Sequence, residues 1–241
     1  MKKNASVLML YMRFAVYRLL IVLAALLVLD YAVFAFFDRA GSFMNITAAG
    51  LIFAAAFAAT VFVCICPIGG KSRFGYTLQR LNVSEKLVFI NHCVSNFCAY
   101  LILWLVQAAA LFLLAKLFVS SSGEPLGPQG LMLEFYRDRI LHAILPLGSA
   151  EIWARNAVFV FSAALCTAYA PLVMRYEEKK PIFPFIVLVL IMIEFPASLN
   201  LGFGGVLVEA LGPLAFAIVC AIIALETANT GKHAEEDFET P

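Results

Sequence analysis

Two acidic residues, Asp30 and Glu194, lie inside long apolar runs, and they are the side chains with the clearest potential for chemistry. Ionisable residues within a membrane-spanning segment are energetically costly, and they commonly mark substrate or ion pathways. Both are therefore candidates for lining a substrate path. Asp30 has two alternative explanations: a hydrogen bond to a neighbouring helix, or a place near the outer interface beside Tyr31. An interfacial position also explains Glu194 and Glu209.

The motifs of common enzymes and metal proteins are absent from the sequence. It contains no H-E-x-x-H, no G-x-S-x-G and no phosphate-binding loop of the form G-x-x-x-x-G-K-[ST]. His92 and His142 are predicted on opposite sides of the membrane, so they cannot share a metal ion. The six cysteines form no C-x-x-C pair and no cluster with histidine, which indicates neither a zinc site nor a disulfide framework. We therefore expect no catalytic site, no metal and no cofactor in this chain.

The composition indicates an integral membrane protein rather than a soluble enzyme. Hydrophobic residues make up 63% of the chain and charged residues 14%, whereas soluble domains have about 45–50% and about 25%. The formal net charge is +1, and there is no basic block of the kind that nucleic-acid-binding proteins carry. The expected surroundings are therefore a lipid bilayer, and no nucleic-acid partner is expected.

Six apolar runs are long enough to cross a bilayer, because about 20 apolar residues span its core. We predict an all-α protein in which residues 1–225 form a single transmembrane domain. The predicted spans cover about 19–37, 43–67, 87–119, 153–174, 182–199 and 206–225. An amphipathic segment at 7–20 precedes the first span, and the charged segment 131–147 is predicted to be an interfacial amphipathic helix. Residues 226–241 are predicted to be an acidic, disordered tail.

The distribution of Lys and Arg predicts the orientation, since cytoplasmic loops carry an excess of positive charge. With six spans and both termini inside, the cytoplasmic set is Lys2, Lys3, Arg13, Arg18, Lys71, Arg73, Arg80, Lys86, Arg175, Lys179, Lys180 and Lys232. The other side holds only Arg39, Lys116, Arg137, Arg139 and Arg155. We therefore expect the segment 69–86 in the cytoplasm and the 131–147 helix outside.

The segment 69–86 combines positive charge with apolar residues at helical spacing. Phe74, Leu78 and Leu81 fall on one face of a helix. Basic residues surround that face, namely Lys71, Arg73 and Arg80. One interpretation is an ordinary basic loop, and the other is a docking element for a soluble partner.

The order Gly75, Thr77-Leu78, Leu81, Val83-Ser84 resembles the cytoplasmic segment between the second and third helices of type-2 permeases of ATP-binding-cassette exporters. That family's segment typically runs Gly-Thr-Leu, a few residues, then Leu-Pro-Val-Ser, and it forms the coupling helix that docks into the ATPase subunit. Here Tyr76 is inserted after the glycine, and Asn82 replaces the usual proline. Six predicted spans with both termini inside extend the resemblance over the transmembrane domain.

The resemblance implies a permease subunit that lacks its own ATP site and works with a separate ATPase subunit, which binds ATP and Mg. It also implies a second permease half, identical or related, and a multi-pass location in a bacterial plasma membrane. The coupling role falls on Lys71, Arg73, Phe74, Gly75, Tyr76, Thr77, Leu78, Arg80 and Leu81.

Two other functions compete with the exporter hypothesis. A non-transporting scaffold or regulatory subunit would use the same basic segment to bind another cytoplasmic protein or anionic lipid. An intramembrane enzyme would use Asp30 or Glu194, but the sequence supplies no second catalytic group at a suitable position.

Overall fold

The computed structural model describes residues 2–38, 46–65, 84–121, 139–146, 149–176, 182–197 and 206–236, and these ranges are helical without any strand. The prediction of an all-α protein is therefore confirmed for this part of the chain. The helices are α1 (Lys2–Asp38), α2 (Ile46–Ile65), α4 (Glu85–Ser121), α6 (Arg139–Ile144), α7 (Ala150–Tyr176), α8 (Ile182–Ala197) and α9 (Val206–Glu236).

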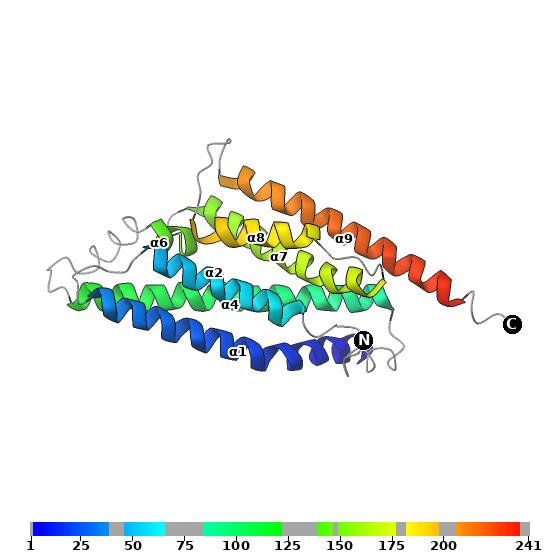
Figure 1. Cartoon of the computed structure of the whole chain (residues 1–241), viewed down its shortest axis with the longest axis horizontal. Coiled ribbons are helices and arrows are strands. Elements are labelled where there is room, and N and C mark those ends of the chain that lie inside the picture. Colours follow the sequence, from blue (N-terminus) through cyan, green and yellow to red (C-terminus); the bar gives the residue numbers. More distant parts are fainter. Residues whose placement is uncertain are drawn as a thin grey trace.

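All of these helices except the short α6 run roughly along the long axis of the molecule (Figure 1). Helices α1 and α4 run in one direction with α2 antiparallel to them, and α7 and α9 run in one direction with α8 antiparallel to them. Helix α1 begins, α2 ends, α4 begins and α9 ends at the same end of the bundle, which we call the N-terminal end. The opposite end, where α6 lies, is called the α6 end.

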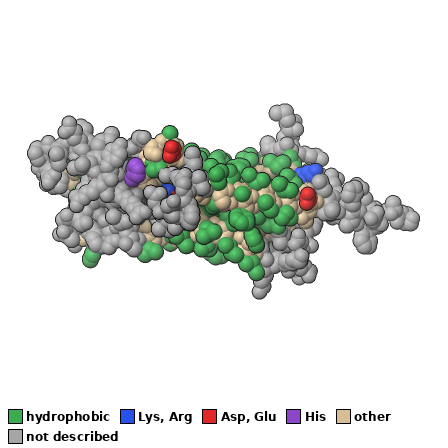
Figure 2. Space-filling model, turned by 90° about the horizontal axis from the view of Figure 1, so that it is seen from above, with side chains coloured by type: hydrophobic (Ala, Val, Ile, Leu, Met, Phe, Trp, Pro, Cys, Tyr) green, Lys and Arg blue, Asp and Glu red, His purple; other side chains and the backbone are tan. Residues whose placement is uncertain are grey.

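Four of these helices are long and apolar enough to cross a membrane, over Ser6–Phe36, Glu85–Ser120, Ala150–Leu172 and Glu209–Thr227. Two shorter apolar helices, Ala49–Ile65 and Ile182–Phe195, lie between them in the sequence. The surface agrees with this composition: Figure 2 shows an apolar belt around the middle of the visible face, with charged side chains towards its two ends. These features are compatible with a multi-pass membrane protein.

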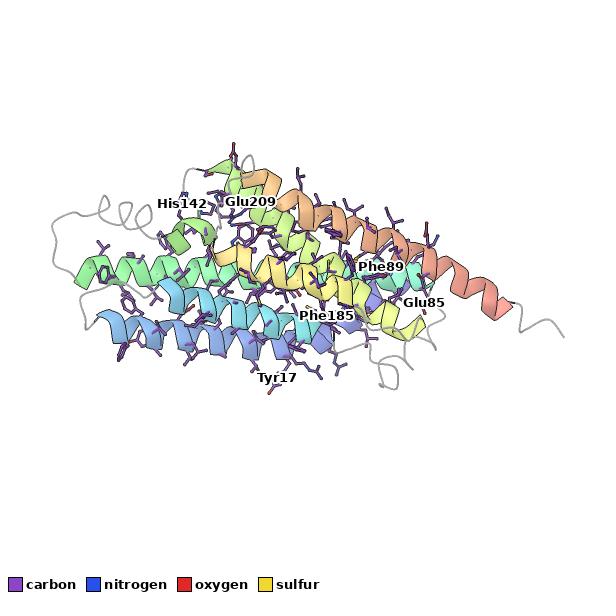
Figure 3. The ribbon with its side chains drawn as sticks, turned by 45° about the horizontal axis from the view of Figure 1, so that its top comes forward. Tyr17, Glu85, Phe89, His142, Phe185 and Glu209 are labelled. Carbon is purple, nitrogen blue, oxygen red and sulfur yellow. The ribbon has the colours of Figure 1, made fainter. Side chains whose placement is uncertain are left out.

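Helix α1 is continuous from Lys2 to Asp38, so the segment predicted at 7–20 and the predicted first span form one helix. The sequence between these residues contains neither Gly nor Pro, and nothing interrupts the backbone hydrogen bonds. Val7, Tyr11 and Leu19 are buried along one side of its first half. Tyr17 projects away from the bundle on the other side (Figure 3).

Helix α9 continues to Glu236, beyond the predicted end of the sixth span at residue 225. The helix thus includes much of the segment predicted to be a disordered tail. The hydroxyl of Thr227 donates to the carbonyl oxygen of Ile223 at 2.9 Å, one turn earlier. This segment contains no proline that would end the helix, and its net polarity alone does not prevent helical hydrogen bonding.

An aromatic cluster joins α2, α4, α7 and α8 in the core. Phe195 of α8 lies 5.2 Å from Phe53 of α2 and 6.0 Å from Phe159 of α7, measured between ring centroids. Phe57 continues the cluster to Tyr100 of α4, with the rings 5.1 Å apart. Close-packed rings of this kind hold the helices in a defined register, and that register positions the buried polar groups described next.

Candidate functional site: the buried polar side chains of the bundle

The predicted coupling residues at 71–81 lie outside the described residues, in the connection between α2 and α4. Most of the predicted interfacial helix at 131–147 also lies outside them, and its described part contains α6. Asp30 and Glu194 are described, and they have different neighbours. Asp30 lies beside Gln107 of α4, and Glu194 lies near Arg155 of α7.

Helix α4 carries a row of polar side chains on the face that it turns into the bundle. His92, Asn96, Tyr100 and Gln107 are all buried, and their spacing places them on one side of a helix. Helix α4 packs against α1, α2 and α7. The row therefore lies among these helices and away from the surroundings of the bundle.

His92 connects three helices near the N-terminal end. Its Nε2 lies 2.9 Å from the carbonyl oxygen of Cys64 in α2, and its ring stacks on Tyr11 of α1 with centroids 4.8 Å apart. A carbonyl oxygen only accepts hydrogen bonds, so Nε2 must carry the proton in this arrangement. The imidazole is thereby fixed in one orientation.

Asn96 joins α4 to α7 through a hydrogen bond between side chains. Its Nδ2 donates to Oγ1 of Thr167 at 3.0 Å. The Thr167 hydroxyl in turn lies 2.8 Å from the Ala163 carbonyl oxygen, one turn earlier in α7, and donates to it. Both side chains are buried, so the pair contributes a defined polar contact inside an otherwise apolar interface.

Asp30 and Gln107 form the polar contact between α1 and α4 further along the row. Asp30 is 1% exposed and Gln107 is 0% exposed. The Gln107 side chain lies beside the Asp30 carboxyl, but the geometry falls short of a hydrogen bond. Both carboxyl oxygens and both amide heteroatoms are without a hydrogen-bond partner among the described residues.

Arg155 is the centre of a second polar cluster, at the α6 end. Its side chain is fully buried in α7, and its charge interacts with Glu209 of α9 and Glu194 of α8. Its Nη2 donates to Oδ1 of Asn156 at 3.1 Å, and its guanidinium lies 5.5 Å from the centre of the Phe159 ring. The cluster therefore ties together the last three long helices.

Three side chains fasten α6 and the turn after it to α4 and α7. Asn156 Nδ2 donates to the Ala143 carbonyl oxygen at 2.8 Å, and Trp104 Nε1 donates to the Ile144 carbonyl oxygen at 2.8 Å. Trp153 Nε1 donates to the Pro146 carbonyl oxygen at 2.9 Å. The last carbonyl groups of a helix have no hydrogen-bond partner within that helix. These donors therefore supply hydrogen bonds to carbonyl groups at the end of α6 and in the turn after it.

The two clusters show what the sequence indicated and what it did not. The sequence indicates Glu194 and Glu209, but it predicts Arg155 only as one positive charge on the outer side and does not predict its burial. Gln107 is not ionisable, so its residue type alone does not mark it as a candidate. Its spacing from His92 and Asn96 on one helical face was the available signal. Figure 3 shows Glu209 and His142 at the α6 end, far from Glu85.

Neither cluster, as far as the structure describes it, presents the side chains of a metal site. Among the described residues, no group of three or more His, Cys, Asp or Glu side chains is placed to hold a metal ion. Within the same ranges, Asp30 has the amide of Gln107 as its neighbour, whereas Glu194 interacts with the carboxyl of Glu209 and the guanidinium of Arg155. The arrangement can orient helices and accommodate a charged ligand.

Comparison with protein-family models, with curated proteins and with solved structures finds no significant match to this chain. A functional conclusion therefore rests on the residues and geometry of the chain itself.

Proposed function

We propose that this chain is the permease subunit of an ATP-driven exporter, a multi-pass protein of the plasma membrane that has no ATP site of its own. A separate ATP-binding-cassette ATPase would bind to its cytoplasmic segment at 71–81. A second permease half, identical or related, would complete the complex.

The direction of the helices is the observation that carries this proposal. Helix α2 ends and α4 begins at the N-terminal end of the bundle, where α1 also begins and α9 ends (Figure 1). If this end faces the cytoplasm, the basic segment between α2 and α4 lies on the side where ATP and a soluble ATPase are found. The excess of Lys and Arg in the corresponding loops supports the same orientation.

Six membrane crossings follow from this orientation, provided that α2 and α8 also span the bilayer. These are the shorter apolar helices, over Ala49–Ile65 and Ile182–Phe195, and their antiparallel packing against longer neighbours suits such a role. The mechanism would be mechanical. ATP binding would close two ATPase subunits, and the segments at 71–81 would transmit that motion to the two permease halves.

Co-purification tests the proposal directly. The full chain is extracted from its native membranes in mild detergent, and the proteins that stay bound are identified and quantified by mass spectrometry. We expect a stoichiometric ATP-binding-cassette ATPase. If the chain is recovered alone or only with other membrane proteins, the proposal is wrong.

Substitutions in the docking segment make the test specific. Phe74→Asp and Leu78→Asp place a charge on the predicted apolar face and should abolish ATPase association. Gln79→Asp introduces the same charge on another side of the predicted helix, so it should leave association close to the wild-type level. Equal recovery of the ATPase with all three variants would exclude docking through this face.

The alternative is a scaffold or regulatory subunit that binds anionic lipid or another cytoplasmic protein through Lys71, Arg73 and Arg80. The basic character of the segment favours it. The reconstituted complex separates the two functions, since ATPase activity stimulated by a transported compound is expected only of the exporter.

A further inference from the structure

Asp30 is buried in the structure together with a polar side chain that does not satisfy it. The carboxyl and the Gln107 amide lie side by side, and all four of their heteroatoms lack hydrogen-bond partners within the described ranges. A buried polar group without a partner costs about 1–3 kcal/mol, and more if it is charged. Two such groups in contact point to a bound ligand that supplies the missing partner to both.

Among the described residues, the surroundings of Asp30 offer no compensating positive charge. Helix α1 packs against α2 and α4, and α2 has no charged residue between Ile46 and Ile65, where Cys64 is the titratable side chain. On α4 the charged residues are Glu85, Lys86 and Lys116, and the other titratable ones are His92, Cys93, Cys98 and Tyr100. On α1, Arg13 and Arg18 are exposed at least three turns away. The side chain that acts on the Asp30 carboxyl is the neutral amide of Gln107.

A charged carboxylate in such a place has a high free energy, because it has lost its hydration and the apolar interior does not stabilise the charge. The charge can be neutralised in one of two ways, by uptake of a proton or by binding of a small metal cation. Water alone would supply hydrogen bonds but would leave the charge in place.

We propose that Asp30 and Gln107 together bind one small monovalent cation, either a proton delivered by hydronium or a sodium ion. With a proton, the acid would donate to Gln107 Oε1, and the Gln107 amide would donate to the other carboxyl oxygen. With sodium, the carboxylate and Oε1 would supply hard oxygen ligands. With a proton every heteroatom of the pair acquires a partner, and with sodium the oxygen atoms of the pair do so. The site goes beyond the exporter proposal and does not depend on it.

Thermal unfolding of the purified full chain in detergent micelles tests the site. Wild type is compared with Asp30→Asn in two series: pH at constant salt, and NaCl replacing choline chloride at constant ionic strength and pH. A ligand that binds only the folded state multiplies the folded-to-unfolded ratio by up to about ten for each tenfold rise in its concentration above Kd. Asp30→Asn has nearly the same shape and needs no cation, so it should lack this dependence.

The two series distinguish the two cations. If the ligand is a proton, wild type gains stability relative to Asp30→Asn as pH falls, because the folded state then binds more protons than the unfolded state. If it is sodium, wild type gains relative to the variant as NaCl rises. Indistinguishable responses of wild type and variant in both series would overturn the proposal.

Glu194→Gln is the matched control, because it makes the same carboxyl-to-amide change in the other polar cluster. It should retain the dependence on cation concentration that Asp30→Asn lacks. Gln107→Leu keeps Asp30 but removes its neighbour, and it should shift the response to higher cation concentration by tenfold or more. The proposal would also be overturned if Glu194→Gln lost the dependence of thermal unfolding on cation concentration while Asp30→Asn kept it.

A labelling measurement covers the case in which Asp30→Asn fails to fold. Dicyclohexylcarbodiimide is apolar and adds to protonated carboxylic acids, and mass spectrometry of the wild-type protein locates the adduct. We expect an adduct on Asp30 that declines as pH rises or, at fixed pH, as NaCl is added. An adduct that neither condition changes, or no adduct on Asp30 at any pH, would contradict the proposed site.

Discussion

The Asn156 side chain fixes the position of α6 by donating from Nδ2 to the carbonyl oxygen of Ala143 at 2.8 Å. Its Oδ1 accepts from Arg155 at the same time, so one amide connects the α6 backbone to the charged cluster of α7, α8 and α9. Because these residues are fully buried, each polar group depends on its neighbours for hydrogen bonds.

Replacing Asn156 should therefore loosen α6 more than it disturbs the bundle. We expect Asn156→Ala to lower the free energy of unfolding by about 1–3 kcal/mol, because it removes a buried donor and a buried acceptor. Hydrogen exchange at residues 143–145 should rise. The control is Asn91→Ala, since the Asn91 side chain, within the described part of the chain, bonds only to Leu87 of its own helix. Unchanged exchange in Asn156→Ala would contradict the proposed anchoring.

The bond between Asn96 and Thr167 should be measurable as a coupling between α4 and α7. Interhelical hydrogen bonds in membrane proteins average about 0.6 kcal/mol and reach about 1.7 kcal/mol. A double-mutant cycle with Asn96→Ala and Thr167→Val, read by unfolding in detergent, should give a coupling in this range. Thr60 is buried and, among the described residues, its side chain bonds only to Ala56 of its own helix, so Asn96→Ala with Thr60→Val should give no coupling.

Arg155 is predicted to be essential for stability through its charge. Arg155→Met should destabilise the protein by about 3 kcal/mol, because loss of one partner of a buried pair leaves the remaining charge uncompensated. Adding Glu194→Gln and Glu209→Gln should recover much of the loss, as the acidic charges are then also removed. Folded yield and thermal unfolding in detergent measure both steps. No recovery in the triple variant would show that packing of the Arg155 stem dominates.

Cys166 and Cys220 are predicted to be bridged by a short dithiol reagent. Their side chains are in contact across α7 and α9. These helices run in the same direction, and Arg155 and Glu209, which precede Cys166 and Cys220 on the two helices, also interact. Dibromobimane becomes fluorescent when it links two thiols, and we expect this in the wild type within a single chain.

The fluorescence should disappear in Cys166→Ser and in Cys220→Ser. Cys98→Ser is the matched control and should retain it. If the signal persists in both Cys166→Ser and Cys220→Ser, another pair of thiols is reacting and the α7–α9 register is wrong.

The sequence by itself determined that the protein is highly apolar and that its long apolar runs are helical, which is compatible with a multi-pass membrane protein. Runs of about 20 apolar residues have few other stable forms, since a bilayer requires every backbone group to be hydrogen-bonded within its own segment. It also located Asp30 and Glu194 as unusual positions. The sequence does not predict the continuous helix through residues 7–20 and beyond residue 225, because polar residues do not by themselves prevent or require the end of a helix.

Only the tertiary structure decided which polar side chains meet. Asp30 and Gln107 are brought together by the parallel packing of α1 and α4, and Arg155 reaches Glu194 and Glu209 because α8 and α9 both pack against α7. No local pattern encodes these pairs, since their separation along the chain is large and the register between helices depends on side-chain packing. The chemistry was therefore visible in the sequence as residue types, and its partners were fixed by the packing.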